Sequence, residues 1–400
     1  MTSDTYRSTA NCAICGRVTE EFFKVEKIPL LTPDNFGSRH KGVFSNADLT
    51  LCYCDECSNI QLKEIVSTDI LYKNFRYETK RTHGLSSHFK SLAENILNQG
   101  NSKKGFVVDI GSNDGTLLSH FLKYARVLGV EPSEYCVNLA KSRGIDTLNV
   151  FFSSQVSSEI LEAYGKADII FCANTLANVP DLHDFVAGIS LLLDERGVCV
   201  IETQNGHAVL QNFMIDTIYH EHLYYFSSSA LIKLFKIHGL HPSSIQAHDQ
   251  KGGSIRAIFT KGKSSFRETA SDIKIYGELL DQFLVRDSEM RLSFERWRES
   301  NKSFLGYGAS VGTLTQIRYF EMEDCIKTIV DDNPLCPEIV GSKPIPVIST
   351  VPFFEAEKNT KSNDGIFLFA YRYIDAIIDK HPDFARMLKR RLFSPFLNGR

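Results

Sequence analysis

The chain has 400 residues, of which 43% are hydrophobic and 23% are charged, with a formal net charge of −3. This length predicts two or three domains, because a single hydrophobic core seldom grows beyond about 300 residues. The small negative charge indicates no electrostatic surface for nucleic acid or anionic membrane. The first residues lack the basic start and apolar core of a signal peptide, and no apolar run is long enough to span a membrane, so we expect a cytoplasmic protein.

Two CxxC pairs lie in the first 57 residues. They consist of Cys12, Cys15, Cys54 and Cys57. Cytoplasmic cysteines are expected as free thiols or metal ligands rather than as disulfides. Each pair can place two thiolates on one ion, and two pairs complete a tetrahedral structural Zn²⁺ site that leaves no open position for catalysis. Unrelated buried cysteines are the alternative, and Cys52 is a nearby spare ligand. We predict a zinc-binding domain over residues 1–68.

Strand and helix patterns alternate from residue 69 on. Residues 106–110 and 126–130 have the continuous apolar character of buried parallel strands. "ADIIFCANTLANV" and "GVCVIETQN" supply two more strands with a helical pattern between them. This alternation predicts an α/β fold with a doubly wound sheet over residues 69–263. We predict a Rossmann-like C-terminal domain over residues 264–400, which begins with a long linker helix.

The first strand–helix turn indicates which cofactor the sheet binds. It reads "DIGSNDG" and lacks the GxGxxG spacing of a dinucleotide site. An acid at the strand end and a polar glycine turn suit S-adenosylmethionine (SAM), which has a zwitterionic end and a sulfonium. Glu131, at the next strand end, is placed to accept hydrogen bonds from the ribose hydroxyls. A different nucleotide in this crevice is the alternative. The candidate SAM-binding residues are Asp109, Gly111, Ser112, Asn113, Asp114, Gly115, Glu131 and Pro132.

A second glycine turn, "GYGASVG", comes close to a dinucleotide-binding pattern. Gly306, Gly308 and Gly312 follow a predicted strand, and Asp331 and Asp332 end the next one. One extra residue precedes the last glycine of the pattern. We expect that the third domain shares the fold, or contacts a nucleotide, without holding NAD.

Four features stand in order along the chain: CxxC…CxxC, "VVDIGSNDGTLL", "ANTLANVPDLHDFV" and "DTIYHEHLYYFS". In this order they resemble the SAM-dependent C-methyltransferases that act on nucleotide-linked deoxysugars, from the first CxxC to "GSKPIPV" near residue 345. The resemblance implies a zinc domain, a SAM domain and a Rossmann-like domain. It also implies a 4-keto-6-deoxy sugar on a nucleotide diphosphate as the substrate, methylated at C3.

The resemblance assigns active-site roles to five residues of this chain. Tyr219, Glu221 and His222 of the YHEH segment would line the active site together with Asn174, and Tyr77 matches a tyrosine upstream of the SAM domain. Tyr77 and Asn174 are also candidate SAM-binding residues. The chain also departs from the family pattern. Asn178 stands where the family usually has a histidine, and the basic residues of the family's third domain are missing around "GYGASVG" and "DDNP".

Carbon methylation next to a ketone needs a base for the α proton and donors for the enolate oxygen. A histidine can titrate near neutral pH, so His222 is a natural proton acceptor, and Glu221 could raise its basicity. Tyr219 could donate to the enolate oxygen or act as the base itself, and the residues leave this choice open. Asn174 and Asn178 could orient the substrate. On a regular strand Tyr219 and Glu221 would face away from His222, so their convergence requires a turn.

Several alternatives stay open at this point. His220 and His222 could bind a metal as an HxH pair, and Arg256 beside Gly252 and Gly253 could be the counter-charge of a phosphate. The protein could instead be an O-methyltransferase, or a zinc protein that binds a nucleotide sugar without turning it over. We expect a nucleotide-diphosphate keto-deoxysugar as the partner molecule and no nucleic acid. The oligomeric state is open, and a monomer is compatible with the sequence.

Overall fold

The computed structural model describes residues 5–30, 46–72, 76–82, 84–98, 105–262, 266, 272–332, 334, 338–339, 344–351, 364–381 and 392–394. Contacts divide the chain into two compact units, and neither is continuous in sequence. Unit 1 comprises Met1–Glu21, Leu51–Ala208 and Glu221–Gly277. Unit 2 comprises Phe22–Thr50, Val209–His220 and Glu278–Arg400. The domain boundaries near residues 68 and 263 stay a prediction.

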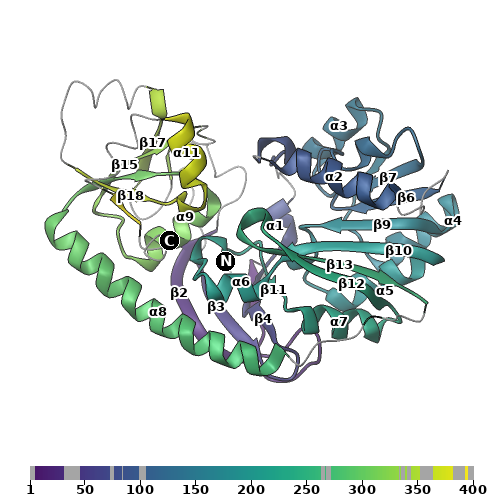
Figure 1. Cartoon of the computed structure of the whole chain (residues 1–400), viewed down its shortest axis with the longest axis horizontal. Helices are drawn as coiled ribbons and strands as arrows, with labels where there is room; N and C mark the ends of the chain where they lie inside the picture. Colours follow the sequence, from purple (N-terminus) through teal and green to yellow (C-terminus); the bar gives the residue numbers. More distant parts are fainter. Residues whose placement is uncertain are drawn as a thin grey trace. The chain divides into compact units, whose positions relative to one another are not determined.

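A seven-stranded sheet forms the centre of unit 1 (Figure 1). In their order across the sheet, the strands are β12 (His241–His248), β13 (Ser254–Thr260), β10 (Leu193–Gln204), β9 (Ala167–Ala173), β6 (Phe106–Ile110), β7 (Arg126–Val130) and β8 (Thr147–Leu148). The five strands from β10 to β8 are parallel, and β13 runs antiparallel to both of its neighbours. The predicted α/β sheet is confirmed, with an antiparallel edge that the sequence patterns did not indicate.

The strand order reverses at β6, and this reversal determines where a ligand can bind. After β6 the chain builds β7 and β8 on one side and then returns to build β9 and β10 on the other. The connections after β6 and β9 therefore leave the sheet in opposite directions. In open α/β sheets such a switch point leaves a crevice at the carboxyl ends of the strands.

Helices cover both faces of this sheet (Figure 1). Those that pack with β6 and β9 through Val107, Ile169 and Phe171 are α2 (Leu85–Asn98) and α3 (Glu134–Ser142). Those on the opposite face are α4 (Ser154–Tyr164), α5 (Leu182–Leu192) and α7 (Ser228–Ile237). Four of these helices begin at a side chain that accepts a backbone N–H, which stabilises a helix start by about 1 kcal/mol. The capping residues are Ser133, Ser153, Asp181 and Ser227.

Short strands surround the N-terminal cysteines in unit 1. β1 (Tyr6–Ser8) pairs with β5 (Glu64–Val66), and β4 (Asn59–Leu62) pairs with the end of β3 (Asn46–Cys54). β11 (Tyr224–Tyr225) pairs with the other edge of β4, so the segment after YHEH joins this small sheet. α1 (Thr68–Tyr72) follows β5.

Unit 2 contains a second sheet, of six strands. In order they are β16 (Glu338–Ile339), β17 (Ile345–Ser349), β15 (Ile326–Asp331), β14 (Phe304–Tyr307), β18 (Gly365–Leu368) and β19 (Leu392–Phe393). All pairs are parallel except that of β16 with β17. β14, α9 (Val311–Tyr319) and β15 form the predicted strand–turn–helix–strand unit. The short helices after β18 are η6 (Tyr371–Tyr373) and α11 (Ile374–Lys380).

One helix, α8 (Asp272–Ser300), spans the predicted linker segment. Its apolar stripe is core packing, as expected. Phe283 and Phe294 are buried, and the Phe294 ring lies 4.8 Å from that of Phe320. The side chain of Ile273, which also belongs to the predicted stripe, lies outside the described residues.

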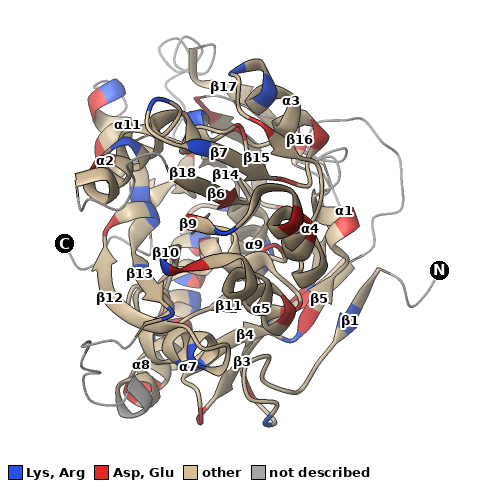
Figure 2. Ribbon diagram, turned by 90° about the vertical axis from the view of Figure 1, so that its right-hand side faces the viewer, with Lys and Arg blue, Asp and Glu red and all other residues tan. Residues whose placement is uncertain are grey.

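The described residues show two further features of the surface and of the helices. In Figure 2, Lys and Arg are interspersed with Asp and Glu along the ribbon, which agrees with the small net charge. Among the residues that the structure describes, no helix is both long enough and apolar enough to cross a membrane.

Candidate active site

The glycine turn after β6 packs tightly against the loop that follows β9. Gly111 and Gly115 have φ angles of 75° and 74°, which side chains rarely adopt. A Cβ atom on Gly111 would lie 2.0 Å from Thr175 Oγ1, and one on Gly115 would lie 2.6 Å from Ile145 Cδ1. Only glycine therefore allows this turn to lie against the neighbouring loop at the switch point.

Asn113 and Glu131 connect the turn to the segment before α2. The Asn113 side chain accepts the Thr79 N–H at 3.0 Å and donates to the Tyr77 carbonyl at 2.9 Å. Glu131 accepts the Asn113 N–H at 3.0 Å on one oxygen and the Ser133 N–H at 2.9 Å on the other. Burial raises the pKa of Glu131, although these two N–H groups favour its charged form. Each carboxylate oxygen retains a lone pair that a ribose hydroxyl could use.

Asp109 and Ser112 carry buried polar atoms at the carboxyl end of β6 and in the turn that follows it. Asp109 is 3% exposed and Ser112 is 4% exposed. Among the described residues, neither Asp109 Oδ1 nor Ser112 Oγ has a hydrogen-bond partner. Burial, with a smaller contribution from the charge of Glu131, raises the pKa of Asp109 to about 8. Such atoms are costly unless a ligand satisfies them, so the turn fits a ligand that carries a positive charge and hydrogen-bond donors.

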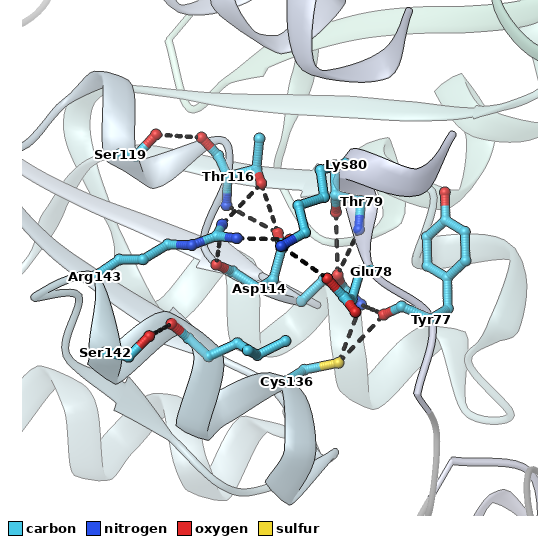
Figure 3. A network of polar contacts seen from close by, with 12 residues as sticks. Tyr77, Glu78, Thr79, Lys80, Asp114, Thr116, Ser119, Cys136, Ser142 and Arg143 are labelled. Carbon is cyan, nitrogen blue, oxygen red and sulfur yellow. Dashed lines mark hydrogen bonds and ion pairs between the residues drawn. The ribbon is translucent and has the colours of Figure 1, made fainter. Parts of the chain in front are cut away.

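Asp114 has a different role from the one predicted for a cofactor-binding residue (Figure 3). Its fully buried carboxylate accepts the Thr116 hydroxyl at 2.6 Å and lies 3.3 Å from the Arg143 guanidinium. Arg143 also donates to the Asp114 carbonyl at 2.8 Å. These contacts hold the turn together, so the Asp114 side chain faces protein rather than a ligand.

The segment that precedes α2 has its own polar contacts (Figure 3). The Tyr77 hydroxyl hydrogen-bonds to that of Thr82. Glu78 accepts from the Tyr135 hydroxyl at 3.0 Å and pairs with Lys80 at 3.1 Å. Tyr77 thus contacts the glycine turn through its backbone carbonyl, which both Asn113 and the Cys136 thiol approach.

The two predicted asparagines lie in the loop after β9, which includes η3 (Leu176–Asn178). Asn174 has a φ of 58° and donates its backbone N–H to the Glu202 carbonyl at 2.7 Å. The Asn178 side chain has a buried Oδ1 for which the described part of the chain offers no hydrogen-bond partner. Because Thr175 of this loop lies against Gly111, both asparagines are close in sequence to the contact with the glycine turn.

The YHEH residues form a turn rather than a strand, and the convergence of their side chains stays a prediction. Tyr219 and His220 belong to unit 2, whereas Glu221 and His222 belong to unit 1. His220 is buried and donates from Nε2 to the Asp48 carbonyl at 3.3 Å, and burial lowers its pKa to about 4. The His220 ring is thus bonded to a backbone carbonyl, and the HxH alternative stays a prediction.

Glu221 and His222 adjoin η3 within unit 1. The next residue, Leu223, donates its N–H to the Ala177 carbonyl at 2.8 Å, and the Tyr72 hydroxyl donates to the Glu221 carbonyl at 3.2 Å. Burial raises the pKa of Glu221 to about 7. The glycine turn, η3, Glu221 and His222 are therefore linked by consecutive contacts at one side of the sheet. A carboxyl group that titrates near neutral pH is a candidate acid or base.

The structure also reveals a cluster that the sequence patterns did not indicate. Glu202, at the end of β10, is 2.8 Å from His88 Nε2, 2.5 Å from Arg256 Nε and 3.7 Å from His248 Nε2. Burial would raise the pKa of Glu202, but His88 and Arg256 hold it below its usual range. Arg256 thus pairs with Glu202 inside the protein, and its pairing with a phosphate stays an untested alternative. The strand-end acid in "VIETQN" was the one available sequence sign of this cluster.

The four predicted cysteines come together. The Sγ atoms of Cys12, Cys15, Cys54 and Cys57 all lie within 4.8 Å of one another, and the Cys15–Cys54 pair is 3.6 Å apart. Zn–S bonds of about 2.3 Å in a tetrahedron place neighbouring sulfurs roughly 3.8 Å apart. The cluster could therefore hold a metal ion with little adjustment. The spare Cys52 is not part of it.

Comparisons with known families define the class of the central domain. Residues 77–244 match the family model described as "Methyltransferase domain". Residues 249–390 match the model described as "C-methyltransferase C-terminal domain". The chain therefore contains a SAM-dependent methyltransferase domain, followed by a C-terminal domain of the type found in C-methyltransferases.

A curated relative and two solved structures can be compared with the chain. It is 32% identical to the C-methyltransferase NovU of Streptomyces niveus over 209 residues, which are 52% of this chain and 50% of NovU. The chain thus spans about half the length of this relative. The magnesium protoporphyrin IX methyltransferase ChlM of Synechocystis PCC 6803 with bound SAH is 14% identical, with 45% of this chain and 84% of ChlM covered and a TM-score of 0.36.

An S-adenosylmethionine-dependent methyltransferase of Clostridium acetobutylicum ATCC 824 has the same TM-score of 0.36. It is 13% identical, with 44% of this chain and 92% of that chain covered. Likenesses at these TM-scores are weak, so the fold assignment depends on the sheet order and the family models.

Proposed function

We propose that the protein transfers the methyl group of SAM to C3 of a nucleotide-linked 4-keto-6-deoxy sugar. The observation that supports this most is the contact between η3 and the end of the YHEH segment. It brings Glu221, whose pKa is about 7, and His222 next to the loop that packs against the glycine turn. A titratable group beside the methyl-donor crevice suits proton removal, and the matching C-terminal model favours carbon as the acceptor.

Three residues of the crevice would hold SAM, which supplies an electrophilic methyl group on its sulfonium. Glu131 would accept hydrogen bonds from the ribose hydroxyls with its remaining lone pairs. Asp109 and Ser112 would pair with the polar end of the ligand, because both present buried oxygens that have no partner in the described protein. Burial of these groups also excludes water from the charges that they meet.

In the proposed reaction, His222 or Tyr219 removes the proton from the carbon next to the ketone. The electron pair of the C–H bond moves to the carbonyl oxygen as an enolate, and the carbon then attacks the methyl group as the methyl–sulfur bond breaks. Asn178 would donate its amide N–H to the carbonyl oxygen. Loss of one such donor typically costs about 100- to 1,000-fold in kcat. A positioned general base contributes about 100- to 10,000-fold.

We also propose that the four-cysteine cluster binds Zn²⁺ in a structural role. The spacing of the four sulfurs fits a tetrahedral thiolate site, which would join the "CAIC" turn to the end of β3. Four thiolates leave no open coordination position, so the metal would stabilise the fold and take no part in methyl transfer.

The test incubates the protein with SAM and dTDP-, GDP-, CDP- and UDP-linked 4-keto-6-deoxy sugars, followed by mass spectrometry and NMR. We expect one added methyl group at C3 on one of these sugars. The α hydrogen should also exchange with D2O, and His222→Gln should slow methyl transfer at least about 100-fold. His120→Gln, in η2 (Leu118–His120), is the matched control.

A methyl group found on oxygen, without exchange of the α hydrogen, would assign an O-methyltransferase instead. Bound SAM without methyl transfer to any of the sugars would contradict the proposal and favour a binding protein. Unchanged methyl transfer in His222→Gln would leave Tyr219 as the base.

A further inference from the structure

The chain packs closely against the glycine turn of the second sheet. In a dinucleotide-binding domain, the pyrophosphate lies on the first turn of the helix that follows the glycines. Here that helix is α9, and its first turn contains Gly312. A Cβ atom on Gly312 would lie 1.8 Å from the carbonyl oxygen of Asp216. The last glycine of such a turn serves close packing, and here it lets the backbone carbonyl of Asp216 lie against the first turn of α9.

A second contact fixes the same segment on α9. The Thr315 hydroxyl, one turn further along the helix, donates to the Ile218 carbonyl at 2.7 Å. Asp216 lies in η4 (Ile215–Thr217), and Ile218 directly follows it. Both carbonyls thus approach the N-terminal half of α9, where the partial positive charge of a helix favours oxygen atoms. All of these residues belong to unit 2.

The Asp216 side chain is held by residues after β18. Its Oδ1 accepts the Tyr371 hydroxyl at 2.6 Å, and its Oδ2 lies 2.8 Å from Arg372 Nε and 2.7 Å from Arg372 Nη2. Asp216 is 8% exposed and Tyr371 is 6% exposed, so the pair is shielded from water. We refer to Asp216, Tyr371 and Arg372 as the Asp216 anchor. Charge-assisted bonds in a buried setting hold their partners in a defined geometry.

We propose that the Asp216 anchor is a positioning device for the YHEH motif, and that it holds the segment before this motif against α9. Asp216 precedes Tyr219 by three residues, so the anchor determines where the chain enters the motif. The inference rests on the proposed function in one respect, namely that Tyr219 takes part in the reaction. The binding of the segment to α9 does not depend on that function.

The first test measures hydrogen exchange in the full-length protein, with no sugar substrate. The Thr217 and Ile218 amides are bonded within the segment to the Met214 and Ile215 carbonyls. In Asp216→Asn these two amides should exchange at least about 10-fold faster than in the wild type. Unchanged exchange would overturn the anchor, whatever the activity of the enzyme.

A control variant separates the anchor from a general loss of stability. Asp332→Asn removes another carboxylate of unit 2, which is paired with Lys380 at 2.9 Å and His381 at 2.7 Å. It should leave exchange in the segment unchanged, and equal acceleration by both variants would overturn the proposal. If Asp216→Asn does not fold, Tyr371→Phe removes a single donor to Asp216 and serves in its place.

The second test separates positioning from substrate binding. Asp216→Asn should lower kcat about 10- to 100-fold while the Kd for SAM changes by less than about twofold, because a misplaced reacting group affects the chemical step. Unchanged kcat with faster exchange would overturn the catalytic part of the inference. No methyl transfer by the wild type would instead contradict the proposed function.

Discussion

Asp109 is expected to release a proton when SAM binds. In the free protein, burial and the nearby Glu131 raise its pKa to about 8, and its Oδ1 has no hydrogen-bond partner in the described residues. With that value, about nine-tenths of the molecules carry the proton at pH 7. SAM brings a positive charge into the crevice, and a nearby positive charge favours the ionised carboxylate. Binding should therefore displace the proton.

The number of protons released on SAM binding follows from the raised pKa of Asp109. If the bound state holds Asp109 ionised, binding at pH 7 releases about 0.9 proton through this group. The affinity for SAM should then rise about tenfold per pH unit up to pH 8 and level off above it.

The raised pKa of Asp109 also means that the free protein loses stability as the pH rises from about 4 to 8. At pH 7 this loss amounts to roughly 4 kcal/mol, which Asp109→Asn should largely remove.

Calorimetry measures the proton release directly. Titrations of SAM in buffers with different ionisation enthalpies give the number of protons released at each pH. The amino group of SAM also titrates near pH 8, so Asp109→Asn is the necessary reference. Only the difference between the two proteins reports on Asp109. Thermal melting of the SAM-free proteins at pH 5 and pH 8 provides an independent measure.

Two results would refute this reasoning. Equal proton release by the wild type and by Asp109→Asn would show that Asp109 is not protonated in the free protein or is not ionised in the complex. A wild type whose melting temperature does not fall relative to Asp109→Asn between pH 5 and pH 8 would show that the carboxylate is not destabilised by burial.

Three further predictions concern other charged and metal-binding groups. Glu202→Gln should destabilise unit 1 by about 3 kcal/mol at pH 7, because it leaves the charge of Arg256 unpaired. Since the pKa of Glu202 is lowered, the stabilisation by its charged form should be present above about pH 4 and be lost below it. Melting curves from pH 3 to 7 test the direction of this pH dependence. Cys54→Ala should lower both the zinc content by elemental analysis and the melting temperature, whereas retention of zinc, or equal losses in Cys52→Ala, would contradict the cluster. Glu221→Gln should remove an ionisation near pH 7 from the pH profile of kcat/KM, and an unchanged profile would exclude Glu221 as that group.

Much of the fold could be predicted from local patterns. Neighbouring residues determine the apolar strands β6 and β7 and the glycine turn between β6 and the next helix. Strand propensity and turn geometry act over only a few positions. The two CxxC turns are equally local, and their meeting followed from the requirement for four ligands. The YHEH segment was identified by its resemblance to a family motif. Its turn was expected because Tyr219 and Glu221 would face away from His222 on a regular strand.

Tertiary structure decided the partners of the charged groups. The sequence indicated Asp114 as a ligand-binding residue and left the role of Arg256 open, and in the structure they pair with Arg143 and Glu202. Asp216 and Arg372 are 156 positions apart, and no periodicity connects them. The physical reason is that a buried charge must find a partner in whichever element packs against it, and that packing is determined by the assembled sheets. The sequence by itself therefore determined the strands, the glycine turns and the metal-ligand pairs, whereas only the folded chain determined which charged groups remain available for a ligand.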